Sequence, residues 1–269
     1  MKPNTDNILS KAPRLIKEVL KIFLLVYVGL GLILFIFQEK YIYYPDKTDF
    51  KNCSSFKNAD QISFGTSRGY LTKRSEDKII VYYHGNALRA CDRDYLDSFF
   101  VGQDYSTYFV EYSGYAESES KPSMSTLLQN VTDTINFLKT QNFENIIVAG
   151  ESIGVGPASY HALHSNINKI ILITAYNNLA DVAFSHYPIY PMRLLLRNNF
   201  TPDVWLANYK GQVSIIIAEK DEIIPNILSQ KLFEEIPSDL KKIYTVKGAG
   251  HNTIYEKDEF YSHLESALK

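Results

Sequence analysis

The sequence predicts an α/β fold in which helices cover both faces of a mostly parallel sheet. Apolar runs of strand length alternate along the chain with segments of helical periodicity, which is the pattern of parallel strands joined by crossover helices. A long apolar segment near the N-terminus precedes this alternation and predicts a transmembrane helix. The expected architecture is therefore one α/β domain behind an N-terminal membrane anchor.

The N-terminal apolar segment is long enough to cross a bilayer. Residues 22–37 are apolar throughout, and Val19 and Leu20 extend the run across Lys21, whose long side chain can reach the interface. About 18 helical residues cover roughly 27 Å, close to the hydrocarbon thickness. Residues 1–40 are therefore expected to form a basic segment and an anchor. A cleaved signal peptide and a buried core helix are the alternatives, although a core helix would need a polar face.

Basic residues around this segment predict its orientation. Five precede it, whereas only Lys40 and Lys47 follow closely, and the more basic side of a span stays cytoplasmic. We expect the N-terminus in the cytoplasm and the folded domain on the non-cytoplasmic side. No small-x-small cleavage pattern follows the segment, so the helix should be retained. The five preceding residues are Lys2, Lys11, Arg14, Lys17 and Lys21.

The α/β domain is expected over residues 41–269. Residues 122–140 carry apolar side chains at the spacing of an amphipathic helix, and a second helix is expected over residues 157–163. Predicted strands lie at residues 78–83, 107–112, 146–149, 168–174, 213–218 and 242–246. Because helices separate most of these strands, the sheet should be largely parallel.

A G-x-S-x-G motif follows the predicted strand at residues 146–149 and precedes a helix. This context is typical of a nucleophile elbow, a turn with no room for side chains at Gly150 and Gly154. The serine between them adopts a strained backbone conformation that exposes its hydroxyl above the sheet. Ser152 is therefore the candidate nucleophile, and ordinary turn chemistry is the alternative interpretation.

An acid and a histidine follow Ser152 in the chain order of a nucleophile, acid and base triad. Asp221 and His251 each lie just past the carboxyl end of a predicted strand, the edge where open α/β sheets carry their chemistry. A serine hydroxyl is a weak nucleophile, so His251 would take its proton as general base. Asp221 would hold the imidazole in the required tautomer.

Two neighbours of Asp221 are alternative acids. Glu219 lies nearer the strand and Glu222 lies one residue further on, whereas residues 221–225 open the next helix from the loop, which favours Asp221. Four other histidines are interpreted as surface or packing residues rather than bases. They are His161, His164, His186 and His263.

The loop after the strand at residues 78–83 completes the candidate site. His84, Gly85 and Asn86 follow this strand directly. Behind a nucleophile elbow, one oxyanion-hole amide comes from this loop and the other from the residue after the nucleophile. The backbone N–H groups of Asn86 and Ile153 are therefore the candidate donors, and one such donor stabilises a transition state by about 3 kcal/mol.

Together these motifs resemble the α/β-hydrolase superfamily, and more narrowly its membrane-anchored α/β-hydrolase-domain-containing serine hydrolases. The resemblance covers residues 20–265. It implies the α/β-hydrolase fold and a membrane-anchored serine hydrolase, and it departs from the family pattern at Leu88 and Ala116. The motifs that carry it lie at residues 41–45, 84–86, 112–115, 150–154, 221–225 and 248–252.

Residues 175–211 are rich in aromatic residues and prolines. In the enzymes that this chain resembles, an insertion at this place forms a small cap over the active site, and a plain surface excursion is the alternative. Apolar cap side chains would suit a small-molecule or lipid-like acyl substrate.

The expected reaction is hydrolysis of a carboxylic ester or thioester. An amide or peptide hydrolase of the serine aminopeptidase type and an inactive membrane-tethered binding module are the rival hypotheses.

Composition excludes several function classes. With 45% hydrophobic and 22% charged residues, the 269-residue chain can form a packed core. A net charge of −2 and the lack of a basic stripe argue against nucleic acid as a partner. The sequence contains no nucleotide-binding glycine motif and no metal-ligand cluster, so no cofactor or metal is expected. Cys53 and Cys91 either pair in an oxidising compartment or stay free, and the sequence leaves the oligomeric state open.

Overall fold

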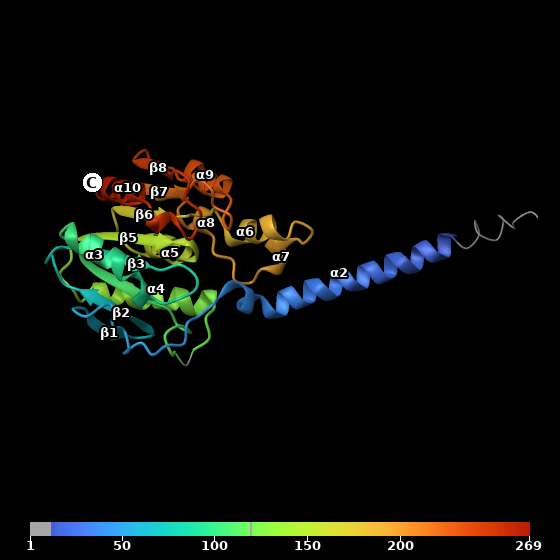
Figure 1. Ribbon diagram of the computed structural model, residues 1–269, viewed down its shortest axis with the longest axis horizontal. Coiled ribbons are helices and arrows are strands. Elements are labelled where there is room, and N and C mark those ends of the chain that lie inside the picture. The colour runs from blue at the N-terminus through green and yellow to red at the C-terminus, as the bar shows by residue number, and fades with distance from the viewer. Residues whose placement is uncertain (1–11, 119) are drawn as a thin grey trace, which may run out of the picture.

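A computed structural model describes residues 12–118 and 120–269 and contains one eight-stranded sheet in the order β1-β2-β4-β3-β5-β6-β7-β8 (Figure 1). The six strands predicted from the sequence are confirmed as β3 to β8. The strands are β1 (Asp60–Phe64), β2 (Ser67–Thr72), β3 (Lys78–Tyr83), β4 (Ser106–Glu111), β5 (Asn145–Glu151), β6 (Lys169–Ile173), β7 (Gln212–Ala218) and β8 (Lys241–Val246).

The sheet is parallel from β4 to β8, and β1 and β2 join it at one edge in antiparallel pairs. β5 lies between β3 and β6, with Tyr83 opposite Gly150 and Glu151 opposite Ile173. Because neighbouring parallel strands end at the same edge, the loops after β3, β5, β7 and β8 gather there. The fold therefore brings the candidate site residues to one side of the sheet.

Helices cover both faces of the sheet, as the alternation predicts. Side chains along the central strands alternate between two buried clusters: Ile79, Val81 and Tyr83 face one, and Ile80 and Tyr82 the other. One face packs against α4 (Met124–Leu138), α5 (Val155–His164), α8 (Pro202–Trp205) and α9 (Asn226–Glu235); the other packs against α3 (Asp94–Gly102) and α10 (Asp258–Leu268). Burial on both faces explains why these strands are apolar at consecutive positions.

The segment after β6 divides into two parts. α6 (Leu179–His186) and α7 (Met192–Leu195) project beyond the sheet beside the N-terminal helix, and we call residues 179–196 the cap (Figure 1). The later part packs on the body, because Phe200 and Trp205 contact each other and Trp205 contacts Tyr160 of α5.

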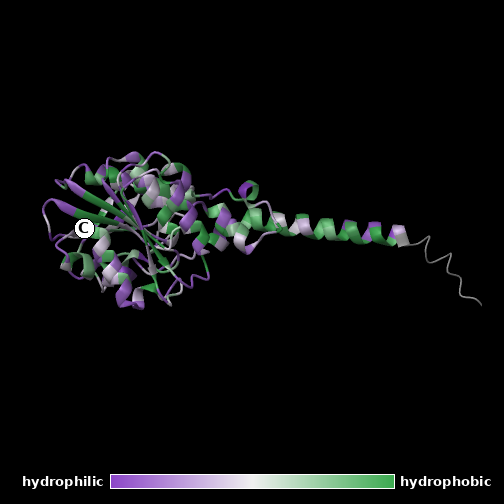
Figure 2. Ribbon diagram, turned by 90° about the horizontal axis from the view of Figure 1, so that it is seen from above, coloured by the Kyte–Doolittle hydropathy of each residue, from purple (hydrophilic) through white to green (hydrophobic). Residues whose placement is uncertain are grey.

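The N-terminal helix α2 (Ala12–Ile42) extends away from the domain and is apolar over most of its length (Figure 2). It is long and apolar enough to cross a membrane, with a mean hydropathy of 2.7 over its most apolar window and little of that window buried. The fold class predicted from the sequence is thus confirmed, with this helix as a candidate span. Lys2 and Lys11 of the basic segment lie outside the described residues.

Cys53 and Cys91 form a disulfide, with Cα atoms 5.8 Å apart. This resolves the two alternatives left by the sequence. The bond ties the long connection between α2 and β1 to the 3₁₀ turn η1 (Ala90–Arg93), which follows β3. It therefore restrains a segment beside the carboxyl edge of the sheet.

We expect that unfolded protein will contain no alkylatable thiol until a reductant is added. Cys91→Ser should lower the free energy of unfolding by about 2–4 kcal/mol, because the unfolded chain gains loop entropy. Urea unfolding in detergent micelles measures this loss. Cys53→Ser should match it, and reductant should destabilise the wild type but neither variant. Two thiols alkylated without reductant would rule out the bond.

Candidate active site

The nucleophile-elbow geometry is present at the end of β5. Ser152 has φ +52°, a left-handed conformation that side chains rarely adopt. A Cβ on Gly150 would lie 2.4 Å from the carbonyl oxygen of Gly154, and a Cβ on Gly154 would lie 2.1 Å from that of Tyr83. Both glycines are therefore required sterically, and the strained serine points into the pocket described below.

The structure brings Ser152, Asp221 and His251 together. His251 Nε2 lies 3.0 Å from Ser152 Oγ, and His251 Nδ1 lies 2.8 and 3.0 Å from the two carboxylate oxygens of Asp221. An ionised carboxylate only accepts hydrogen bonds, so Nδ1–H donates to Asp221 and the neutral ring presents an unprotonated Nε2 to the serine hydroxyl. This arrangement can remove a proton from Ser152.

The neighbouring acids make other contacts. Glu222 Oε2 accepts a hydrogen bond from the backbone N–H of His251 at 3.1 Å, and Glu219 Oε2 accepts one from Gly248 at 2.7 Å. Asp221 also accepts bonds from the backbone N–H groups of Ile223 and Ile224. The imidazole therefore pairs with Asp221, while both glutamates hold the loop around His251.

The loop after β3 is fixed by the side chain of Asn86. Its Nδ2 donates to the carbonyl of Ile42 at the end of α2, and its Oδ1 accepts from the backbone N–H of Tyr44 and the hydroxyl of Tyr115. Ala87 and Leu88, which follow, have φ values of +59° and +60°. The loop carrying the candidate oxyanion donor is thus held against the end of α2 and the segment that follows it.

A buried ion pair lies directly beneath the nucleophile, and sequence reasoning did not find it. Arg93 Nη2 donates to Glu151 Oε1 at 2.8 Å, and the Tyr82 hydroxyl donates to Glu151 Oε2 at 2.6 Å. Burial alone would raise the pKa of Glu151, but Arg93 and these hydrogen bonds outweigh burial and hold the pKa well below its usual range. Glu151 therefore stays ionised next to Ser152. A Cβ on Gly85 would lie 2.4 Å from Glu151 Oε1, so the glycine makes room for it.

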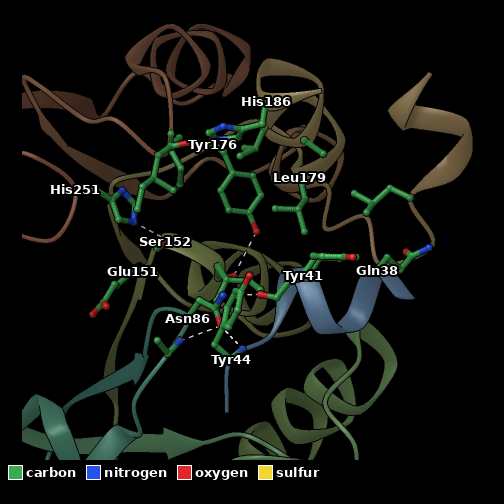
Figure 3. Close-up of a pocket in the computed structure, with 18 of the residues that line it drawn as sticks. Gln38, Tyr41, Tyr44, Asn86, Glu151, Ser152, Tyr176, Leu179, His186 and His251 are labelled. Atoms are coloured by element: carbon green, nitrogen blue, oxygen red, sulfur yellow. Dashed lines mark hydrogen bonds between the residues drawn. The ribbon is translucent and has the colours of Figure 1, made fainter. Parts of the chain in front are cut away.

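The candidate site opens into a cavity of about 590 Å³ between the sheet edge, the cap and α2 (Figure 3). Ser152, His251, Asn86 and Ile153 line its floor together, so the predicted nucleophile, base and oxyanion donors share one space. The surrounding wall is mostly apolar. The residues of α2 and the cap that line it are Leu34, Gln38, Tyr41, Ile42, Leu179, Val182, Ala183, His186, Tyr187, Met192, Leu195 and Leu196.

The sequence did not indicate that α2 lines this cavity, because its apolar run predicts only a membrane anchor. Gln38 is buried, and its side chain contacts both the carbonyl of Leu195 and the backbone N–H of Arg197. Only the folded chain shows that the end of the helix and the cap meet across the pocket.

The other histidines lie in different surroundings. His161 is buried in α5 against the hydroxyl of Tyr83, and burial lowers its pKa to about 3. His164 contacts Tyr160, and His263 contacts Tyr244. His186 lines the pocket, and its Nε2–H donates to the carbonyl of Ile223, which links the cap to the loop of Asp221. Within residues 12–118 and 120–269 no group of three metal-ligating side chains forms.

The chain has the α/β-hydrolase fold, and its sequence is similar to that of proteins named for this fold. No family model matches it. It is 26% identical over 239 residues to an uncharacterized protein of Mycobacterium tuberculosis, across 84% of this chain and 85% of that protein. It is 27% identical over 202 residues to α/β hydrolase domain-containing protein 17C of Homo sapiens, across 71% of this chain and 56% of that protein. The chain thus matches little more than half the length of the 17C protein.

Solved structures share the fold. An esterase of Pyrococcus furiosus superposes with a TM-score of 0.68 at 13% identity, covering 84% of this chain and 97% of that one. A monoacylglycerol lipase of Paleococcus ferrophilus gives a TM-score of 0.55 at 18% identity, covering 74% and 96%. The resemblance to α/β-hydrolases predicted from the sequence is confirmed.

Gly154→Ala should lower the free energy of unfolding by about 1–3 kcal/mol, because the added methyl group has no space beside the Tyr83 carbonyl. Gly102→Ala, at the end of α3, is the matched control, since a Cβ there meets no heavy atom within 4 Å. Urea unfolding of both variants in detergent measures the difference. Equal midpoints for the two variants would contradict the steric role of Gly154.

Proposed function

We propose that the chain is a membrane-anchored serine hydrolase that cleaves a carboxylic ester or thioester through an acyl-enzyme intermediate. The observation that carries the proposal is the contact of Ser152 Oγ with His251 Nε2 at 3.0 Å, on a strained turn that opens into an apolar pocket. Ser152 would be the nucleophile, His251 the general base, and Asp221 the group that orients the base.

In the first step, Ser152 Oγ attacks the carbonyl carbon while His251 Nε2 takes the hydroxyl proton. The carbonyl oxygen becomes an oxyanion, which the backbone N–H groups of Asn86 and Ile153 would receive. The intermediate collapses, the bond to the leaving group breaks, and His251 returns the proton to that group. In the second step, water attacks the acyl carbon and His251 takes one water proton. The bond between the acyl carbon and Ser152 Oγ then breaks, His251 gives the proton to Oγ, and the carboxylic acid leaves.

The pocket wall supports an ester or thioester with an apolar acyl group. Most cap side chains that line it are aliphatic, and burial of each methylene of an acyl chain is favourable by about 0.8 kcal/mol. The solved structures of similar fold include enzymes described as esterases and a monoacylglycerol lipase. We therefore favour an ester or thioester over the amide substrate of a serine aminopeptidase.

Membrane anchoring and orientation form part of the proposal. α2 is apolar enough to span a bilayer, and the basic residues before it favour a cytoplasmic N-terminus. The Cys53–Cys91 disulfide supports a folded domain in an oxidising, non-cytoplasmic compartment. The proposed organisation is a basic segment and anchor over residues 1–40, and a hydrolase domain over residues 41–269 with an insertion at about residues 175–211 that contains the cap.

A fluorophosphonate probe should label the wild type at Ser152, because only a base-activated serine reacts quickly. Ser152→Ala should abolish labelling and hydrolysis of p-nitrophenyl esters while keeping the wild-type circular dichroism spectrum. Acyl thioesters and aminoacyl amides, assayed beside the esters, distinguish the rival substrate classes. Continued labelling of Ser152→Ala would exclude the assigned nucleophile, and a wild type that is neither labelled nor active would favour a binding module.

Asp221→Asn should reduce kcat about 10³–10⁴-fold, because the amide favours the wrong tautomer of His251. His251→Ala should reduce kcat to a similar degree. Glu219→Gln and Glu222→Gln are the matched controls and should keep most of the activity, since both contact only backbone N–H groups around His251. Steady-state kinetics on one soluble ester compares the four variants. An active Asp221→Asn beside an inactive Glu219→Gln would reassign the acid.

The protein should remain in the membrane fraction after carbonate extraction, and protease added to spheroplasts should digest the C-terminal domain. The apolar helix α2 is the reason for retention in the membrane, and the excess of basic residues before it is the reason for the orientation. A C-terminal tag followed by immunoblotting measures both outcomes. Digestion only after lysis would reverse the orientation, and release by carbonate would favour a cleaved leader.

A further inference from the structure

The cap packs on one side of α2 along a stripe of the helix. Ala180, Tyr190 and Met192 of the cap form a small buried cluster with Tyr27 and Leu34 of the helix. The Tyr27 and Tyr190 rings stack with centroids 4.7 Å apart, the Tyr27 hydroxyl donates to the carbonyl of Ile189, and the Tyr190 hydroxyl donates to that of Tyr27. The cap is therefore held at a defined height on the helix.

Gly31 and Gln38 lie on the same stripe of α2. A Cβ on Gly31 would lie 3.1 Å from the Tyr190 ring, so the missing side chain permits close contact. One helical turn further along the stripe lie Leu34 and then Gln38, which bonds to the carbonyl of Leu195. The spacing of Tyr27, Gly31, Leu34 and Gln38 is that of one helix face.

The position of the apolar run fixes which part of α2 lies in hydrocarbon. The first part of the helix carries Arg14, Lys17, Glu18 and Lys21 and cannot span a bilayer. Residues 22–37 cover roughly 24 Å and must supply the span. Tyr27 lies about 15 Å from the end of that run, measured along the helix. A cap that contacts Tyr27 must therefore enter the membrane together with the helix.

Large apolar side chains are exposed on the outer surface of the cap. Leu194 is 82% exposed, Ile189 is 68% exposed, and Phe184 is about half exposed. The basic residues beside this surface have acidic partners: Arg193 pairs with Asp181 at 2.9 Å and Arg197 pairs with Glu39 at 3.1 Å. An apolar surface continuous with a membrane helix has the chemistry expected of a lipid contact.

We propose that the cap is inserted in the non-cytoplasmic leaflet and that the pocket receives a long-chain acyl substrate directly from the bilayer. Leu34 lines the pocket and lies within the apolar run, so the cavity reaches hydrocarbon depth. An acyl chain could then pass between α2 and the cap toward Ser152 without crossing water. Insertion of the cap rests on the proposed membrane anchor and orientation, and the substrate route rests also on the proposed hydrolase activity.

A lipid-quenching experiment tests insertion without relying on activity. Both native cysteines are paired, so Leu194→Cys can be labelled with the fluorophore NBD in the full-length protein without reductant. In phosphatidylcholine vesicles containing 12-doxyl phosphatidylcholine, the label should be strongly quenched and its emission shifted to the blue. Leu240→Cys is the matched control, because Leu240 is 65% exposed but lies directly before β8, at the amino ends of the parallel strands and away from the cap. The label at position 240 should stay unquenched.

Quenching at position 194 no greater than at position 240 overturns the insertion of the cap. A blue-shifted but unquenched label at position 194 would place a protein partner on the cap and would also overturn it.

A rate ratio tests the substrate route. Leu194 and Ile189 do not line the pocket, so Leu194→Glu and Ile189→Glu should leave p-nitrophenyl acetate hydrolysis unchanged. Hydrolysis of p-nitrophenyl palmitate embedded in vesicles should fall at least about tenfold, because a carboxylate is disfavoured at hydrocarbon depth. An unchanged palmitate-to-acetate ratio in both variants overturns entry from the bilayer. A wild type inactive on both esters would instead contradict the proposed function, and the quenching result would still decide insertion.

Discussion

The close approach of the turn after β5 to the end of β3 is the constraint on which the candidate site depends. Gly154 fits against the carbonyl of Tyr83 only because it has no side chain. The parallel register, with Tyr83 opposite Gly150, brings these two loops to the same height. As a result Ser152, the amide that follows it and the loop of Asn86 face one cavity, and no long-range motion is needed to assemble them.

The charge buried under this turn links the site to the rest of the chain. Glu151 is held by Arg93, which lies in the turn η1 two residues after Cys91. The disulfide ties η1 to the segment before β1, and the buried ion pair ties it to the end of β5. A buried ion pair adds little net stability, but removal of one partner leaves an uncompensated charge. The pair therefore fixes where the elbow lies relative to the loop after β3 rather than adding to the free energy of unfolding.

Most of the parallel sheet could be predicted because strands buried on both faces carry runs of consecutive apolar residues. The antiparallel edge could not, since no residue of β1 is fully buried, only two of its five residues are apolar, and β2 begins with Ser67, Arg68 and Gly69. Motif and chain order predicted Ser152, Asp221 and His251 as site residues, because each follows a strand, and the structure brings the three side chains together. Arg93 and Gln38 gave no such signal: their partners are far away in sequence, and only the folded chain brings them to the site.

The contacts of Asn86 with Ile42 and Tyr44 have a consequence for any soluble form of this protein. A chain cleaved just after the helix, whether by a cellular protease or by a cloning boundary, would lose Leu34 and Gln38 from the wall of its cavity and part of the support for its loop after β3. Removal of α2 would therefore alter the binding surface itself, so a released domain would differ from the full chain in chemistry as well as in length.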